Sequence, residues 1–258
     1  MADHTATKHI VLIHGAWQGS WSFDAWRPWL ERAGWRTHAV DLPGNGWGPT
    51  AHDPANLSTY TDHVVATLDA LDAPAVVLGH SGGGITASQV AEAAPDRVIG
   101  LVYLAGMMLA SGQSFADLVR DVARADPDAP VAGISPYLDT DRVADTTRVR
   151  PEGALACFLQ DCEPQAAQRA IAMLRAQPES GRRMMNHLTP ERFGRVPRIY
   201  VECRNDASVT LPLQRAMQHA SPGAHVLSLA CGHVPQLVQT EALSQTLIPE
   251  LDALHRVT

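Results

Sequence analysis

Short apolar runs rich in β-branched residues alternate along this chain with amphipathic stretches, and this alternation limits the fold more than any other feature. Six runs are predicted as strands, at 8–13, 35–41, 75–79, 98–104, 197–203 and 224–229. Several are apolar throughout, which is typical of parallel strands buried on both faces. Helical patterns are found at about 22–33, 58–71, 83–94, 209–220 and 235–255. This order predicts right-handed βαβ crossovers and a three-layer α/β sandwich with a mostly parallel central sheet.

One long segment, at about 110–195, interrupts the alternation. It shows no convincing strand, and prolines divide it into short helical pieces such as 163–176. An insertion of this length in a parallel-sheet fold is expected to form a helical cap over the carboxyl edge of the sheet, and an ordinary run of surface helices is the alternative. The chain, 1–258, is otherwise expected to form one α/β domain.

Composition and charge argue against several classes of protein. A formal net charge of −7 disfavours nucleic acid or an anionic membrane as a partner. The apolar stretch at 98–110 is too short and too interrupted by glycine to cross a bilayer, and the first apolar run, at 10–13, is too short for a secretory signal. The four cysteines form no C-x-x-C pair and are expected to be reduced, without a zinc site. We therefore expect a soluble cytoplasmic protein without a metal; whether it forms a homodimer stays open.

The stretch VVLGHSGGGIT at 76–86 is open to three interpretations. A phosphate-binding P-loop requires a lysine after its last glycine, and the sequence has none there. A dinucleotide loop fits the glycines, but the next predicted strand ends without the carboxylate that would bind a ribose. The third interpretation is G-x-S-x-G, in which Ser81 lies in a tight strand-to-helix turn between Gly79 and Gly83. We favour this nucleophile elbow because the crowding of such a turn explains both glycines.

A serine nucleophile needs a histidine base that a carboxylate orients. In this kind of fold the three follow strand ends in the order serine, acid, histidine. His233 comes just after the last predicted strand and is placed to act as the base, whereas His80 projects from the elbow in another direction. Asp206 follows the preceding strand and is favoured as the acid over Glu202, which lies within that strand.

Two backbone N–H groups are expected to bind the oxyanion formed during acyl transfer. One belongs to Gly82, directly after the nucleophile, and the other to Ala16, in the loop after the first strand. The substrate is expected between the elbow and the cap, near Trp17, Met107 and Phe158.

With these residues in place, the sequence resembles the α/β-hydrolase superfamily along nearly its whole length. It is most similar to the branch that contains plant methylesterases, hydroxynitrile lyases and their bacterial esterase relatives. The matching blocks are IVLIHGAWQGSW at 10–21, AVDLPGNG at 39–46, VVLGHSGGG at 76–84, VPRIYVECRND at 196–206 and GHVPQLVQTEAL at 232–243. The resemblance implies a triad of Ser81, Asp206 and His233, an oxyanion pair of Ala16 and Gly82, no cofactor, and a small-molecule ester as substrate.

Two positions distinguish esterases from lyases in that branch. The lyases that this sequence resembles carry threonine in place of Gly15 and lysine directly after the catalytic histidine, where this chain has Val234. The resemblance therefore implies a serine carboxylesterase that cleaves a small to medium, uncharged ester or lactone through an acyl-enzyme on Ser81. A hydroxynitrile lyase or carbon–carbon bond hydrolase with the same triad is the alternative, and a non-catalytic binding protein on the same scaffold is a third hypothesis.

Overall fold

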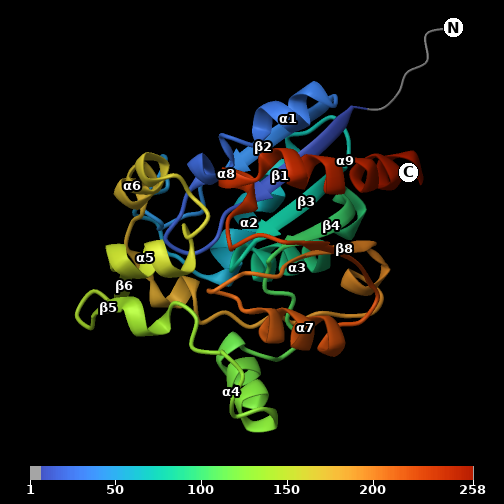
Figure 1. Ribbon diagram of the computed structural model, residues 1–258. Helices are drawn as coiled ribbons and strands as arrows, with labels where there is room; N and C mark the ends of the chain where they lie inside the picture. The colour runs from blue at the N-terminus through green and yellow to red at the C-terminus, as the bar shows by residue number, and fades with distance from the viewer. Residues whose placement is uncertain (1–6, 258) are drawn as a thin grey trace, which may run out of the picture.

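The computed structural model describes residues 7–257 and is built on a parallel sheet (Figure 1). Residues 1–6, part of the segment in which no secretory signal was recognised, lie outside this range. The described residues form a six-stranded sheet in the order β2-β1-β3-β4-β8-β9, in which every neighbouring pair is parallel. The strands are β1 (Lys8–Ile13), β2 (Trp35–Val40), β3 (Ala75–His80), β4 (Val98–Leu104), β8 (Arg198–Cys203) and β9 (Ala224–Leu229). The register sets Ile13 beside Gly79 and His80 beside Leu104, so β1, β3 and β4 end together at the carboxyl edge.

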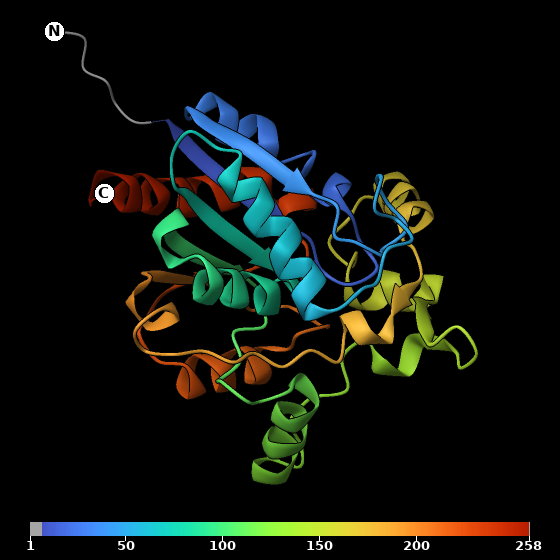
Figure 2. The same ribbon diagram turned by 180° about the vertical axis from the view of Figure 1, so that it is seen from behind.

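Helices cover both faces of the sheet, which gives three layers (Figure 2). Alternate residues of β1 enter the two cores: Val11 and Ile13 pack with α2, α3 and α7, while Ile10 and Leu12 pack with α1 and α9. This two-sided burial explains the uninterrupted apolar runs. The helices outside the insertion are α1 (Arg27–Arg32), α2 (Leu57–Asp69), α3 (Gly83–Ala93), α7 (Leu211–Ala220), α8 (Pro235–Val238) and α9 (Thr240–Val257), with short 3₁₀ helices η1 (Ser20–Phe23) and η2 (Pro95–Arg97). The predicted α/β sandwich with a mostly parallel sheet is confirmed.

Two predicted helices are each interrupted once in the structure. The stretch predicted as a helix over 22–33 forms η1 and then α1, in which Pro28 lies in the first turn, where its missing N–H costs no helical hydrogen bond. The stretch predicted over 235–255 forms α8 and α9, separated by Gln239, whose φ of −127° and ψ of 44° are not helical.

The insertion occupies residues 105–197, between the neighbouring strands β4 and β8. It contains α4 (Phe115–Ala125), α5 (Pro151–Cys157), α6 (Pro164–Met173) and the short helices η3 (Ser135–Tyr137), η4 (Glu179–Gly181) and η5 (Phe193–Arg195). It also contains a three-stranded antiparallel sheet of β5 (Leu138–Asp141), β6 (Thr146–Val149) and β7 (Gln177–Pro178). The expectation that this segment lacks strands is therefore wrong.

The small sheet escaped prediction because its strands are short and mostly polar. β5 is largely exposed, and β6 has one fully buried residue, Thr147, so neither shows the alternation that marks a strand with an apolar face. The turn that joins them is held by Asp141, whose Oδ1 accepts the N–H groups of Val143 at 2.9 Å and Ala144 at 3.0 Å. Such a local side-chain turn stabilises a hairpin without an apolar signal.

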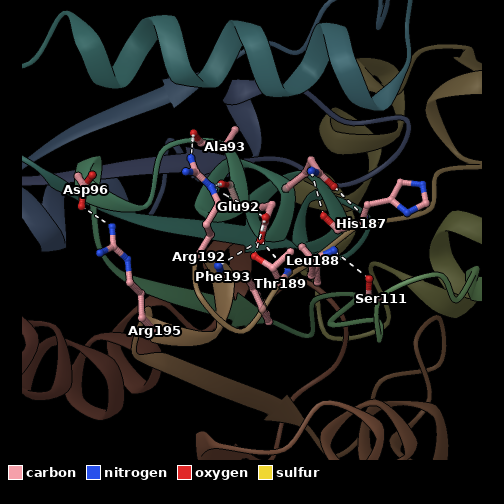
Figure 3. A network of polar contacts seen from close by, with 11 residues as sticks. Glu92, Ala93, Asp96, Ser111, His187, Leu188, Thr189, Arg192, Phe193 and Arg195 are labelled. Carbon is pink, nitrogen blue, oxygen red and sulfur yellow. Dashed lines mark hydrogen bonds and ion pairs between the residues drawn. The ribbon is translucent and has the colours of Figure 1, made fainter.

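The end of the insertion, residues 186–195, is fastened to α3, and we call it the exit segment (Figure 3). The carboxylate of Glu92, near the end of α3, accepts the Thr189 N–H at 2.8 Å, the Thr189 hydroxyl at 2.9 Å and the Phe193 N–H at 3.2 Å. The guanidinium of Arg192 donates to the last carbonyl groups of the same helix, those of Glu92 and Ala93. The exit segment is thus held against the helix that begins beside Ser81.

Residues 7–257 form no helix whose length and hydropathy would suit a membrane span.

Candidate active site

Ser81 lies in the turn between β3 and α3, with a φ of 52°. This left-handed conformation costs a residue with a side chain about 1–3 kcal/mol and is common at functional sites. Two backbone hydrogen bonds maintain it: the Ser81 N–H donates to the Leu104 carbonyl at 3.2 Å, and the Ser81 carbonyl accepts the Met107 N–H at 2.8 Å. The residue is largely buried and lines a cavity.

The glycines around Ser81 differ in how much space a side chain would have. A Cβ on Gly79 would lie 2.5 Å from the Gly83 carbonyl oxygen, and one on Gly83 would lie 2.7 Å from the His14 carbonyl oxygen. One on Gly84 would lie 2.7 Å from the Met107 nitrogen. A Cβ on Gly82, by contrast, would meet no heavy atom nearer than the Ala16 nitrogen at 3.9 Å. Space therefore requires glycine at three positions but not at 82.

His233 and Asp206 meet at the carboxyl edge of the sheet, in the loops after β9 and β8. The His233 Nδ1–H donates to Asp206 Oδ2 at 2.7 Å, and both side chains are buried. Asp206 Oδ1 accepts the N–H groups of Ser208 at 2.7 Å and Val209 at 2.9 Å, which stabilises the charged carboxylate. Because Nδ1 carries the proton in this hydrogen bond, His233 Nε2 is left with a lone pair that can accept a proton.

Glu202, the other carboxylate considered as the acid, has different partners. It accepts hydrogen bonds from the Arg215 guanidinium at 3.3 Å and the Ser228 hydroxyl at 3.0 Å. The structure therefore brings Asp206, and not Glu202, to His233.

His80 connects the elbow to the His233 loop without facing the cavity. Its Nε2–H donates to the His233 carbonyl at 2.8 Å, and the two ring centroids are 4.7 Å apart. Burial lowers the pKa of His80 well below its usual value, so the ring is neutral. His80 thus packs the loop of His233 against the turn that contains Ser81.

The loop after β1, residues 14–17, lies directly over Ser81, and we call it the oxyanion loop. A Cβ on Gly15 would come within 2.8 Å of the Ser81 Cβ, so a side chain there would collide with Ser81. His14 supports the loop, since its Nδ1–H donates to the Gly15 carbonyl at 2.8 Å and its Nε2 accepts the Leu42 N–H at 3.1 Å. Burial lowers the pKa of His14, consistent with this neutral form.

Ala16 and Gly82 are neighbours across the two loops, since a Cβ on Gly82 would lie 3.9 Å from the Ala16 nitrogen. Within residues 7–257 the N–H group of neither residue donates a hydrogen bond to the protein. Both residues line the cavity.

The cavity has a volume of about 650 Å³ and lies between the elbow and the insertion. Trp17 and Met107 line it, together with apolar side chains of the insertion such as Val131, Ile134 and Met184. Phe158 does not belong to its lining. The Phe158 ring is buried and stacks on the His233 ring with centroids 5.2 Å apart, so it packs behind the histidine and not toward the cavity.

One side of the cavity is polar, which sequence reasoning did not anticipate. Glu179, Arg182 and Arg183 line it, and the carboxylate of Glu179 pairs with both arginines, at 3.2 Å for Arg183. In the sequence, the only indication of these ion pairs is that the arginines follow Glu179 by three and four residues, a spacing that favours ion pairs on a helical turn. Nothing in that spacing indicates that the turn faces a cavity.

Among the described residues, no group of three or more His, Cys, Asp or Glu side chains is arranged to hold a metal ion. Cys157, Cys162, Cys203 and Cys231 are free thiols.

The chain is similar to known proteins over nearly its whole length. The model of the "Alpha/beta hydrolase family" matches residues 10–246. A pyrethroid hydrolase from Sphingobium wenxiniae is 30% identical over 252 residues, which span 95% of this chain and 88% of its own. Methylesterase 7 from Arabidopsis thaliana is 28% identical over 267 residues, which span 97% and 98% of the two chains. A crystal structure of a pyrethroid hydrolase superposes with a TM-score of 0.83 at 28% identity, covering 96% of this chain and 98% of that one.

Proposed function

Because the chain belongs to the alpha/beta hydrolase family, and relatives along its whole length include a pyrethroid hydrolase and a methylesterase, we propose that it is a carboxylic ester hydrolase with Ser81 as nucleophile. The observation that carries the proposal is the hydrogen bond of 2.7 Å between His233 and Asp206, at the same sheet edge as the strained Ser81. A serine, a histidine and a buried carboxylate so placed are the groups that acyl transfer requires.

The mechanism follows from the protons these groups hold. His233 Nε2 accepts the proton of the Ser81 hydroxyl as its oxygen attacks the ester carbonyl. The resulting oxyanion accepts hydrogen bonds from the N–H groups of Ala16 and Gly82. His233 then protonates the leaving alcohol, and a water molecule activated by the same nitrogen releases the acid from Ser81. Asp206 remains ionised and stabilises the positive imidazolium.

The cavity suits an uncharged ester or lactone of small to medium size. Its volume of about 650 Å³ lies within the usual range for small-molecule sites. Both arginines of its polar side share the single carboxylate of Glu179, so that side keeps one net positive charge, while Val131, Ile134 and Met184 make much of the remaining lining apolar. Pyrethroids and methyl esters, for which the relatives are named, are therefore suitable test substrates.

Two features count against the lyase alternative. Val234, at the position of the lyase lysine, is apolar and buried, so it supplies no charge to a departing cyanide. Threonine at Gly15 would place its Cβ 2.8 Å from the Ser81 Cβ, so the present loop leaves no room for that side chain.

The test is hydrolysis of short-chain p-nitrophenyl esters, aryl methyl esters and a pyrethroid, with mandelonitrile as the lyase substrate. We expect ester turnover, an initial burst of p-nitrophenol, and a loss of at least about 10⁴-fold in Ser81→Ala. Ser135→Ala is a matched control, because Ser135 also lines the cavity but has no role in the mechanism. Nitrile cleavage without ester turnover, or equal activity in Ser81→Ala and wild type, would refute the proposal.

A further inference from the structure

The oxyanion loop is held by the insertion through the backbone of Trp17. Gln177 Oε1 accepts the Trp17 N–H at 3.2 Å, and the Trp17 carbonyl accepts the Arg175 N–H at 3.0 Å. Trp17 has a φ of 63°, a left-handed conformation that is unfavourable for a residue with a large side chain. The insertion therefore holds both peptide groups of a strained residue that directly follows Ala16.

Gln177 is itself fixed at both ends of its amide. It is buried, and its Nε2 donates to Asn45 Oδ1 at 3.0 Å and to the Tyr60 hydroxyl at 3.2 Å. The Tyr60 hydroxyl donates in turn to Asn45 Oδ1 at 2.9 Å, and burial raises the pKa of Tyr60 to about 12, so the hydroxyl keeps its proton. A Cβ on Gly181 would lie 2.2 Å from the Tyr60 oxygen, so a side chain there would displace this cluster. The orientation of the Gln177 carbonyl toward Trp17 is thus determined.

The indole of Trp17 is held separately, by the neighbouring strand β6. Its Nε1–H donates to the Thr147 hydroxyl at 3.2 Å, and Thr147 pairs with Gln177 in the small sheet. The Arg182 guanidinium lies 4.7 Å from the indole ring centroid. The side chain and the backbone of Trp17 therefore depend on different residues of the insertion. The Thr147 hydroxyl also donates to Glu179 at 3.0 Å and accepts from Arg182 at 3.3 Å, so replacing Thr147 removes these two bonds together with the indole contact.

We propose that Gln177 is a positioning residue for the oxyanion hole, an inference that rests on the proposed function. The peptide group between Ala16 and Trp17 donates its N–H to Gln177, and the Ala16 N–H belongs to the peptide group immediately before it. Fixing the plane of the Ala16–Trp17 peptide group restricts the backbone rotations at Ala16, which set the direction of the preceding N–H. Gln177 thus keeps the Ala16 N–H directed at the oxygen that becomes negative during attack by Ser81.

The expected effect is on the chemical step. Removing an oxyanion donor outright lowers kcat by about 10²–10³-fold. In Gln177→Met the Ala16 donor is still present but is held less firmly, so we expect kcat to fall by about 10–100-fold, with KM within about threefold. Thr147→Val is the matched control: it removes the acceptor of the indole N–H from the same small sheet but leaves the Trp17 backbone bonds intact, and we expect kcat within about threefold of wild type.

A second readout separates positioning from a general loss of structure. An aryl trifluoromethyl ketone binds when Ser81 Oγ adds to its carbonyl carbon: the serine proton passes to His233, and the carbonyl π electrons become an oxyanion. The corresponding methyl ketone fills the same space without forming a stable adduct. In Gln177→Met the inhibition constant of the trifluoromethyl ketone should rise by the same factor by which kcat/KM falls, and that of the methyl ketone should stay within about threefold.

Three results would overturn the inference while wild-type esterase activity stands: kcat of Gln177→Met within threefold of wild type, an equal loss in Thr147→Val, or equal weakening of both ketones. If Gln177→Met does not fold, Gln177→Asn carries the same test, because its amide is polar but one methylene too short to reach Trp17. Absence of ester turnover in the wild type would instead refute the proposed function.

Discussion

Gly82 and Gly83 are adjacent in the elbow, but alanine at Gly83 should destabilise the fold whereas alanine at Gly82 should not. A methyl group on Gly83 would lie 2.7 Å from the carbonyl oxygens of Ile13 and His14. An ordinary contact begins at about 3.4 Å, so the backbone would have to separate by about 0.7 Å at the end of β1. Gly82 has φ −57° and ψ −23°, which any residue adopts, and a methyl group there would meet no atom nearer than 3.9 Å.

These distances translate into a difference in stability. Overpacking of this kind costs about 1–3 kcal/mol, against about 0.4–1 kcal/mol gained because alanine restricts the unfolded chain. Gly83→Ala should therefore lower the free energy of unfolding by up to about 2.6 kcal/mol and the Tm by up to about 10 °C, and it should be about 1–3 kcal/mol less stable than Gly82→Ala. Gly82→Ala should restrict the unfolded chain without overpacking the folded one, so its Tm should equal or exceed that of the wild type.

The assay is thermal unfolding of both variants by circular dichroism, with urea unfolding to obtain free energies. Equal stability of the two variants within about 0.5 kcal/mol would refute the reasoning, because the backbone at the end of β1 would then accommodate a methyl group without a loss in the free energy of unfolding. Gly82→Ala as the less stable variant would refute it as well.

Three further predictions concern charge. Asp206→Asn should lower kcat for p-nitrophenyl esters by about 10⁴-fold, because the tautomer and charge of His233 lose their support; undiminished turnover would mean that the acid lies elsewhere. Burial raises the pKa of Glu92, but hydrogen bonds from Thr189 and neighbouring groups outweigh it and hold that pKa below its usual value. The stabilising contribution of the Glu92 carboxylate is therefore fully present above about pH 4.3 and declines as pH falls below it. Glu92→Gln should cost about 1–3 kcal/mol in urea unfolding at pH 7 and less at pH 3. Burial lowers the pKa of His80 well below its unfolded value, so the unfolded chain binds a proton that the folded chain does not. Stability should then decline below about pH 6.5, by up to about 1.4 kcal/mol per pH unit, and an unchanged slope in His80→Gln would contradict this.

The contact between Asp206 and His233 could be predicted from the sequence because each follows a parallel strand, and neighbouring parallel strands end at one edge. The positions of the six strands and their parallel arrangement could be predicted from apolar runs alone, so the prediction of the sheet was accurate. The roles of the two residues in catalysis stay predictions. The glycines at 79 and 83 were also interpretable, because a tight turn crowds its flanking positions whatever the rest of the fold does.

The insertion resisted prediction for a physical reason. Its strands are short and polar, and the direction of a side chain such as Phe158 depends on how α5 packs against the sheet edge, which no local pattern encodes. The same holds for Gln177, a lone amide in a segment without periodicity, whose partners are 117 to 160 positions away in the chain. Contacts of that range are determined by the assembled fold and not by neighbouring residues.

Because β4 and β8 are parallel neighbours, the chain between them must travel from the carboxyl edge of the sheet back to its amino edge. The exit segment makes this return along α3, fastened by Glu92 (Figure 3). Residues 115–135, which supply several of the side chains that line the cavity, take no part in this return. Laboratory diversification of residues 115–135 should thus reshape the range of esters accepted while the sheet still assembles, whereas changes at 186–195 should be selected against as folding defects. The residues that select the substrate and the residues that fasten the insertion to α3 therefore lie in separate stretches of the insertion.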